Sequence, residues 1–231
     1  MIDEPRVRRA PPPSPQLRAA LANLRPVPTR RPWRRFLAIT GASGGYAALV
    51  LVAGVGLRDD LTDVPRLVFP IYALGCLLSS VALLGLAFVP SRGQVLPSGR
   101  RIFRLALPLL VILIVLHLVV ALTWPGAPSS GGATFLSGAA ACGGLGLGVV
   151  ALPLALALWS LRGALPLDAW RVLLAVAGAE GALGALVLHL HCSRTDALHL
   201  GMVHGAILLA PPLSMVASAV ATRRRKASGR P

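Results

Sequence analysis

The sequence predicts an all-α integral membrane protein, a bundle of six transmembrane helices with both termini in the cytoplasm. Of its 231 residues, 55% are hydrophobic and only 13% are charged, whereas charged residues make up about a quarter of a typical soluble domain. The charged residues form short clusters between long apolar runs. Six of these runs reach the length of about 20 residues that a helix needs to cross a hydrocarbon core of ~30 Å.

The six predicted spans follow one another along most of the chain. Each is expected to be a helix, because lipid offers no hydrogen-bond partner to free backbone groups. Small-residue runs such as residues 178–184 allow helices to pack closely, and Pro153 and the pair Pro211 and Pro212 are expected to kink two of the spans. The predicted spans are residues 36–57, 67–89, 105–124, 135–159, 172–191 and 198–221.

The distribution of basic residues predicts the orientation of the bundle. Twenty of the 23 Lys and Arg residues fall in residues 1–35, in the second and fourth connections or in the tail 222–231, and three fall in the other connections. Because Lys and Arg accumulate on the cytoplasmic side, residues 1–35 and 222–231 are predicted to be cytoplasmic, with residues 36–221 forming the transmembrane domain. The net charge of +15 then reflects topology and not binding of nucleic acid.

Residues 1–35 are predicted to form a basic, proline-rich segment that contains one short amphipathic helix. Ser14 and Pro15 suit the N-cap and the first helical position. A helix of about ten residues is marginally stable alone in water, so it is expected to lie against lipid headgroups or against a cytoplasmic partner. Its candidate partner-binding residues are Leu17, Arg18, Leu21, Leu24 and Arg25.

Histidine and cysteine residues gather in one short stretch of the chain. Residues 187–205, VLHLHCSRTDALHLGMVHG, hold four of the five histidines and Cys192. In the predicted topology these residues fall in the outer half of the bilayer together with Cys142 and His117, whereas Cys76 lies mid-span. Three interpretations remain open: a polar helix edge at the water surface, a transition-metal site, and an oxidisable pair of Cys142 with Cys192 in a disulfide-permissive compartment. The candidate metal ligands are His189, His191, Cys192, His199 and His204.

Glu180 is the only acidic residue within a predicted span, and His117 is a second intramembrane polar residue. An ionisable group at such depth is a candidate functional residue that faces the bundle interior. Alternatively, Glu180 is protonated and hydrogen-bonded to a neighbouring backbone or hydroxyl group. No Walker, Rossmann, HExxH or serine-elbow pattern occurs, so we expect no enzyme activity, and no cofactor apart from the candidate metal ion.

Three features of the sequence, taken together, are typical of one protein family. A short leucine helix is followed by LRPVPTRRPWRRF (residues 24–36), Cys142 lies in the fourth span, and GALGALVLHLHC (residues 181–192) is a small-residue run that closes on Leu-His-Cys. In these features the chain resembles the NrsF family of six-span bacterial membrane proteins. It differs after the second cysteine, where Ser193 and Arg194 stand in place of the family's usual Pro-Glu.

The resemblance implies that the chain is a membrane-bound anti-sigma factor of the bacterial inner membrane. Its cytoplasmic N-terminal segment would hold an extracytoplasmic-function sigma factor at the membrane. The outer-side cysteines of the family, carried over to Cys142 and Cys192, would take part in the response to a signal. The residues, considered without the resemblance, allow an alternative function. The chain would then be a small transporter or metal permease that uses Glu180 and the outer-side His and Cys residues.

Overall fold

The structure is a computed structural model that describes residues 14–16, 31–59, 67–90, 98–124, 132–161, 169–194 and 196–227. The chain divides into two compact units, Met1–Arg31 and Pro32–Pro231. In the first unit a helix begins at Pro15. The predicted partner-binding residues Leu17, Arg18, Leu21, Leu24 and Arg25 lie outside the described residues.

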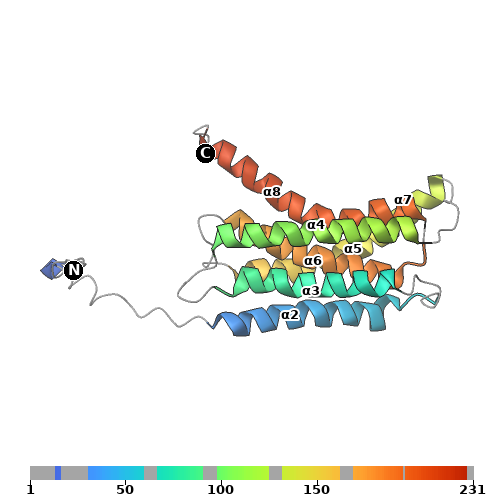
Figure 1. Cartoon of the computed structure of the whole chain (residues 1–231), viewed down its shortest axis with the longest axis horizontal. Helices are drawn as coiled ribbons and strands as arrows, with labels where there is room; N and C mark the ends of the chain where they lie inside the picture. Colours follow the sequence, from blue (N-terminus) through green and yellow to red (C-terminus); the bar gives the residue numbers. More distant parts are fainter. Residues whose placement is uncertain are drawn as a thin grey trace, which may run out of the picture. The chain divides into compact units, whose positions relative to one another are not determined.

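The second unit is all-helical in its described residues, with no strand among them. Six of its helical segments are long and apolar enough to cross a membrane, as the sequence predicted (Figure 1). Two of the six segments contain a short π-helical stretch. In chain order the elements are α2 (Pro32–Leu49) with the π-helix η1 (Val50–Val55), α3 (Val68–Phe88), α4 (Gly99–Thr123), α5 (Gly132–Ser160), α6 (Ala169–His191), and α7 (Ala197–His199) with the π-helix η3 (Leu200–His204) and α8 (Gly205–Ala227).

Helix α6 is the centre of the bundle. In its most apolar stretch 94% of the residues are buried, whereas the corresponding share is 28% in the α2–η1 segment and no more than 44% in any other span. Its glycines explain this close packing. A Cβ atom at Gly181 would lie 2.7 Å from the backbone oxygen of Leu208 in α8, and one at Gly184 would lie 2.5 Å from the side chain of Val150 in α5.

The outside of the bundle is apolar. Helix α4 shows this clearly, because large aliphatic side chains along it are exposed while others are buried against the neighbouring helices. An exposed apolar surface of this extent is unfavourable in water and matches a hydrocarbon environment. The exposed side chains of α4 are Leu105, Leu107, Val111, Ile112, Val115, Leu118, Val119 and Leu122.

The two ends of the bundle differ in chemistry. One end, here called the thiol end, holds the end of η1, the end of α6 and the start of α7, including Gly56, Cys192 and His199. The other end, here called the arginine end, holds the first turns of α2 and α4 with Arg35 and Arg104. Toward the C-terminus, helix α8 leans away from the other helices (Figure 1), and it contains Pro211 and Pro212.

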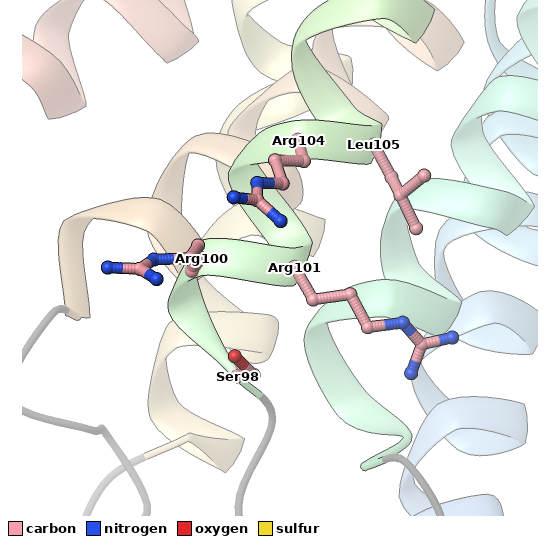
Figure 2. Close-up of a pocket in the computed structure, with 5 residues that line it drawn as sticks. All are labelled: Ser98, Arg100, Arg101, Arg104 and Leu105. Carbon is pink, nitrogen blue, oxygen red and sulfur yellow. The ribbon is translucent and has the colours of Figure 1, made fainter.

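An open depression of about 270 Å³ lies at the arginine end, at the first turn of α4. Figure 2 shows its lining residues, with the side chain of Arg101 pointing away from those of Arg100 and Arg104. The three guanidinium groups therefore do not converge on one point. Their position at a helix end agrees with the basic flanks that orient membrane helices. The lining residues are Ser98, Arg100, Arg101, Arg104 and Leu105.

Candidate functional site

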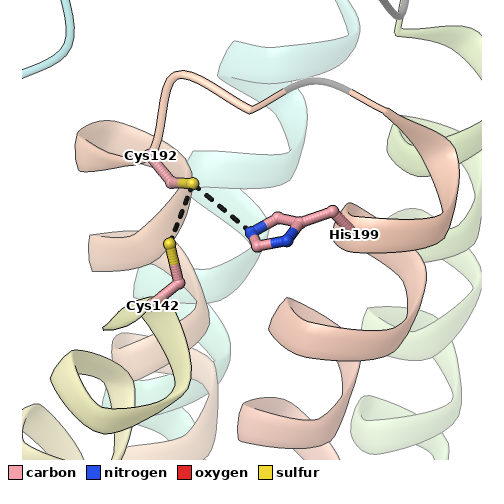
Figure 3. A group of neighbouring side chains, drawn as sticks. All are labelled: Cys142, Cys192 and His199. Carbon is pink, nitrogen blue, oxygen red and sulfur yellow. Dashed lines mark hydrogen bonds between the residues drawn. The ribbon is translucent and has the colours of Figure 1, made fainter. Parts of the chain in front are cut away.

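Two thiols from different helices meet at the thiol end of the bundle. Cys192 directly follows α6 and extends its hydrogen bonding, because its N–H donates to the Leu188 carbonyl at 2.8 Å. Cys142 lies in α5, and the two Sγ atoms are 3.1 Å apart (Figure 3). Both thiols are free; Cys192 is buried and Cys142 is half-buried. The sulfur atoms need to approach by only about 1 Å to form a disulfide.

His199 completes a group of three with the two thiols. Its Nε2 lies 3.4 Å from the Cys192 Sγ (Figure 3), and the ligand atoms of all three residues lie within 4.8 Å of one another. Asp196 fixes this position, because its carboxylate caps α7 by accepting the His199 N–H at 2.8 Å, as an N-cap residue does. Two thiolates and an imidazole are ligands that soft transition metals prefer, so this group has the donor set for such an ion.

Neighbouring groups favour the ionised form of Cys192. The hydrogen bond with the Cys142 thiol lowers the pKa of the Cys192 thiol well below its usual value, and His199 and His204 lower it further, against the opposing effect of burial. The thiolate is the form that attacks oxidants and binds metals. The arrangement therefore supports thiol chemistry or metal binding at Cys192.

A second cluster, here called the imidazole cluster, lies beside the thiols and consists of His117, His189, His204 and Tyr72. All four side chains are buried. His189 Nδ1 lies 2.8 Å from the Ala185 carbonyl and 3.1 Å from His204 Nδ1. Because a carbonyl only accepts, His189 Nδ1 carries the proton. Its Nε2 then holds a lone pair, and this atom has no hydrogen-bond partner among the described residues.

Both ring nitrogens of His117 have hydrogen-bond partners. Its Nε2 lies 3.1 Å from the Leu200 carbonyl, and its Nδ1 lies 3.3 Å from the Tyr72 hydroxyl. Since the carbonyl must accept from Nε2, Nδ1 is left to accept from Tyr72. His117 thereby ties α4 to the π-helical turn η3 and to α3. Such π-helical turns are frequent at functional sites.

The last histidine of α6 connects two helix ends. His191 Nδ1 lies 3.1 Å from the Gly56 carbonyl, and the Arg58 N–H donates to the Leu190 carbonyl at 2.9 Å. Gly56 has φ 81° and ψ 165°, a conformation that is nearly exclusive to glycine. The residues just before Cys192 are thus bonded to the end of the first span.

Glu180 makes a contact in the middle of the bundle. Its side chain is 1% exposed, and its Oε1 accepts a hydrogen bond of 2.8 Å from the Ser43 hydroxyl in α2. The carboxyl oxygen accepts in this bond, which fits both interpretations of the sequence, a protonated Glu180 bonded to a hydroxyl and a functional residue facing the bundle interior. Glu180 therefore joins the central helix to the first span.

Residues 21–224 match the NrsF family, which is described as negative regulator of sigma F. The chain belongs to the NrsF family. The resemblance predicted from the sequence is confirmed. Comparisons with curated proteins and with solved structures found no match.

In this NrsF protein, the predicted site residues separate into three places. Cys142, Cys192 and His199 form one group. His189 and His204 pair with each other beside His117, and His191 bonds to Gly56 instead. The predicted metal ligands thus do not surround one point, and Cys142, which was predicted only as a thiol partner, joins Cys192 and His199.

Sequence reasoning missed several members of these clusters. Ser43 lies in a run of small residues, GASGG, and reads as a packing residue. Tyr72 reads as one more aromatic side chain in an apolar span. The one available signal was Asp196, because an aspartate three residues before His199 fits an N-cap that fixes the start of a helix.

Proposed function

We propose that this NrsF protein is a membrane-bound anti-sigma factor. It holds an extracytoplasmic-function sigma factor at the bacterial inner membrane through its N-terminal cytoplasmic segment, with Leu17, Leu21 and Leu24 as the docking face and Arg18 and Arg25 beside it. A sigma factor held at the bilayer does not reach RNA polymerase. The family match over residues 21–224 and the six apolar helices support this proposal.

The proposal places both termini and the arginine end in the cytoplasm. The supporting observation is the distribution of basic residues, twenty on the side of the two termini against three on the other, because Lys and Arg accumulate in cytoplasmic segments. The thiol end then faces the periplasm, where disulfides form and persist.

The thiol pair is the proposed point at which the signal acts. The single observation that carries this is the 3.1 Å contact of the Cys142 and Cys192 sulfur atoms at the end of the central helix. Oxidation of the pair or capture of a soft metal ion by Cys142, Cys192 and His199 changes the distance between α5 at Cys142 and the end of α6. A signal of either kind shifts the bundle only by the free energy with which it favours one packing over another.

The first span offers a direct route from this end to the sigma factor. Its last residues are bonded to α6 next to Cys192, through Gly56 with His191 and through Arg58 with Leu190. Its middle is bonded to α6 through Ser43 and Glu180. Its helix α2 begins at Pro32, within the N-terminal segment of residues 1–35. A displacement of the α6 end is thus carried along the α2–η1 segment to the start of α2.

Co-purification with the cognate sigma factor tests the proposal. The full chain and a variant lacking residues 1–33 are isolated from membranes in detergent together with the sigma factor, and the full chain is expected to retain it while the deletion variant does not. A triple variant, Leu17→Glu, Leu21→Glu and Leu24→Glu, keeps the segment and should lose the sigma factor too. Retention by both variants at the level of the full chain would contradict the docking assignment.

A further inference from the structure

Arg194 lies two residues after Cys192, and its side chain is half-buried. Its guanidinium packs against α5 at Gly138, where a Cβ atom would stand 2.5 Å from the Arg194 Cζ and 2.7 Å from its Nε. A Cβ atom at position 138 would displace the guanidinium, which is the end of a flexible side chain and can move away from α5. Gly138 therefore provides the space that the Arg194 guanidinium occupies, and this position is here called the seat of Arg194.

The seat brings the positive charge close to the two thiols. Gly138 precedes Cys142 by four residues in α5, and residues four apart lie on the same face of a helix. The guanidinium on Gly138 thus lies about one turn from the Cys142 sulfur, and it acts on that group electrostatically. Cys142 is the half-buried member of the pair, so a reagent from the water phase meets it first.

Of the charged side chains in the described residues, Arg194 acts electrostatically on Cys142, whereas no carboxylate does. Asp196 is buried and keeps its negative charge, and its carboxylate accepts the backbone N–H of His199. Arg58 is buried at the same end of the bundle and acts electrostatically on His189 and His204, which adds a second positive charge. A positive charge beside a reacting group raises the local concentration of anionic reactants.

We propose that Arg194, seated on Gly138, makes the Cys142–Cys192 site selective for anionic thiol reactants over cationic ones. This deepens the proposed function, because it names the charge class of the signal that reaches the thiols. In the test reaction a thiolate attacks the sulfur of an alkyl methanethiosulfonate, a mixed disulfide forms, and methanesulfinate leaves. The reaction needs no further oxidant.

The test compares two reagents of opposite charge on the reduced full chain in a neutral detergent. Sulfonatoethyl methanethiosulfonate is anionic and trimethylammonioethyl methanethiosulfonate is cationic. The rate at which each modifies the Cys142–Cys192 pair is measured by mass spectrometry and divided by the rate with a small free thiol. The native chain is expected to favour the anionic reagent. Arg194→Gln should lower the anion-to-cation ratio roughly tenfold, the low end of such focusing effects, and Arg194→Lys should keep most of it.

Glycine variants test the seat separately. Gly138→Ala leaves the Arg194 charge in the chain but pushes its guanidinium aside, so the ratio should fall, and by less than in Arg194→Gln. Gly143→Ala is the matched control, because a Cβ at Gly143 would meet nothing within 4 Å, and it should keep the native ratio. An unchanged ratio in Arg194→Gln, or a native preference for the cationic reagent, would overturn the proposal. A ratio unchanged by Gly138→Ala would overturn the role of the seat.

The outcome is independent of sigma-factor binding, which is absent from the reaction. Sigma-factor retention by Arg194→Gln, measured by co-purification, also shows that this variant is folded. A lost charge preference with retained sigma factor supports the selectivity and the anti-sigma role together. A native chain that shows the charge preference but never retains a sigma factor would remove the anti-sigma role and leave the selectivity standing.

Discussion

Ser43 in the first span donates a hydrogen bond of 2.8 Å to the buried Glu180 of the central helix. The Oε2 atom of Glu180 has no hydrogen-bond partner among the described residues. A carboxyl group at this depth is costly without partners, so this bond stabilises the contact between α2 and α6. It also fixes the helix that bears the N-terminal segment to the helix that ends at the thiols.

Removing the Ser43 hydroxyl should destabilise the bundle and loosen the first span. Ser43→Ala leaves a buried carboxyl oxygen unsatisfied, which costs about 1–3 kcal/mol, and should lower the thermal unfolding midpoint in detergent. Glu180→Leu removes the buried polar group itself, so adding it to Ser43→Ala should cost less than the sum of the two single changes. Ser214→Ala is the control, because this hydroxyl bonds within its own helix, to the Pro211 carbonyl. Additive effects of Ser43→Ala and Glu180→Leu would contradict the contact.

The turn at Gly56 should transmit the signal. Gly56→Ala forces a side chain into a backbone region that costs about 1–3 kcal/mol for residues other than glycine, and should displace the carbonyl that His191 contacts. The expected result is a weaker transcriptional response to the signal, with sigma-factor binding retained in unstimulated cells. Both are measured with a reporter for the sigma factor's target genes. Gly44→Ala, where a Cβ meets nothing within 4 Å, should respond as the native chain does. An equal response from both variants would remove this turn from the pathway.

Cys192 should stay reactive at acidic pH. Its pKa is lowered by the hydrogen bond with Cys142, so the thiolate persists as the pH falls through the range in which an ordinary thiol, with a pKa of about 8.5, becomes protonated. Alkylation of Cys192 by iodoacetamide, followed by mass spectrometry, should vary little between about pH 6 and 8. In Cys142→Ala, which removes the hydrogen-bond donor, the rate should fall more steeply as the pH decreases. A native profile that falls tenfold per pH unit would show an ordinary thiol.

The fold was predictable from the sequence because its cause is local. Apolar runs of sufficient length specify membrane helices, and all six were found. Gly181 and Gly184 marked close packing, yet the sequence did not show that α6 is the central helix. That follows from contacts with α8 and α5, which lie far along the chain.

The candidate site was predictable in its residue types but not in its grouping. The stretch that contains Cys192, His199 and His204 was recognised, but which side chains share a point depends on the short α7 helix and the π-helical turn η3 after it. The π-helical turn changes the direction of the following side chains relative to an α-helix. The pairing of His191 with Gly56 depends on a glycine 135 positions earlier in the chain, and no periodic pattern reports such a contact.

The most direct measurement is the amount of sigma factor retained on purified membranes before and after the thiols are oxidised with diamide. In native membranes the retained amount should fall roughly tenfold, within the range of typical coupling between two sites. Cys142→Ser, Cys192→Ser and the double variant should each lose this response to a similar degree, because the two thiols act as one unit. Equal release of the sigma factor from native and double-variant membranes would contradict the account.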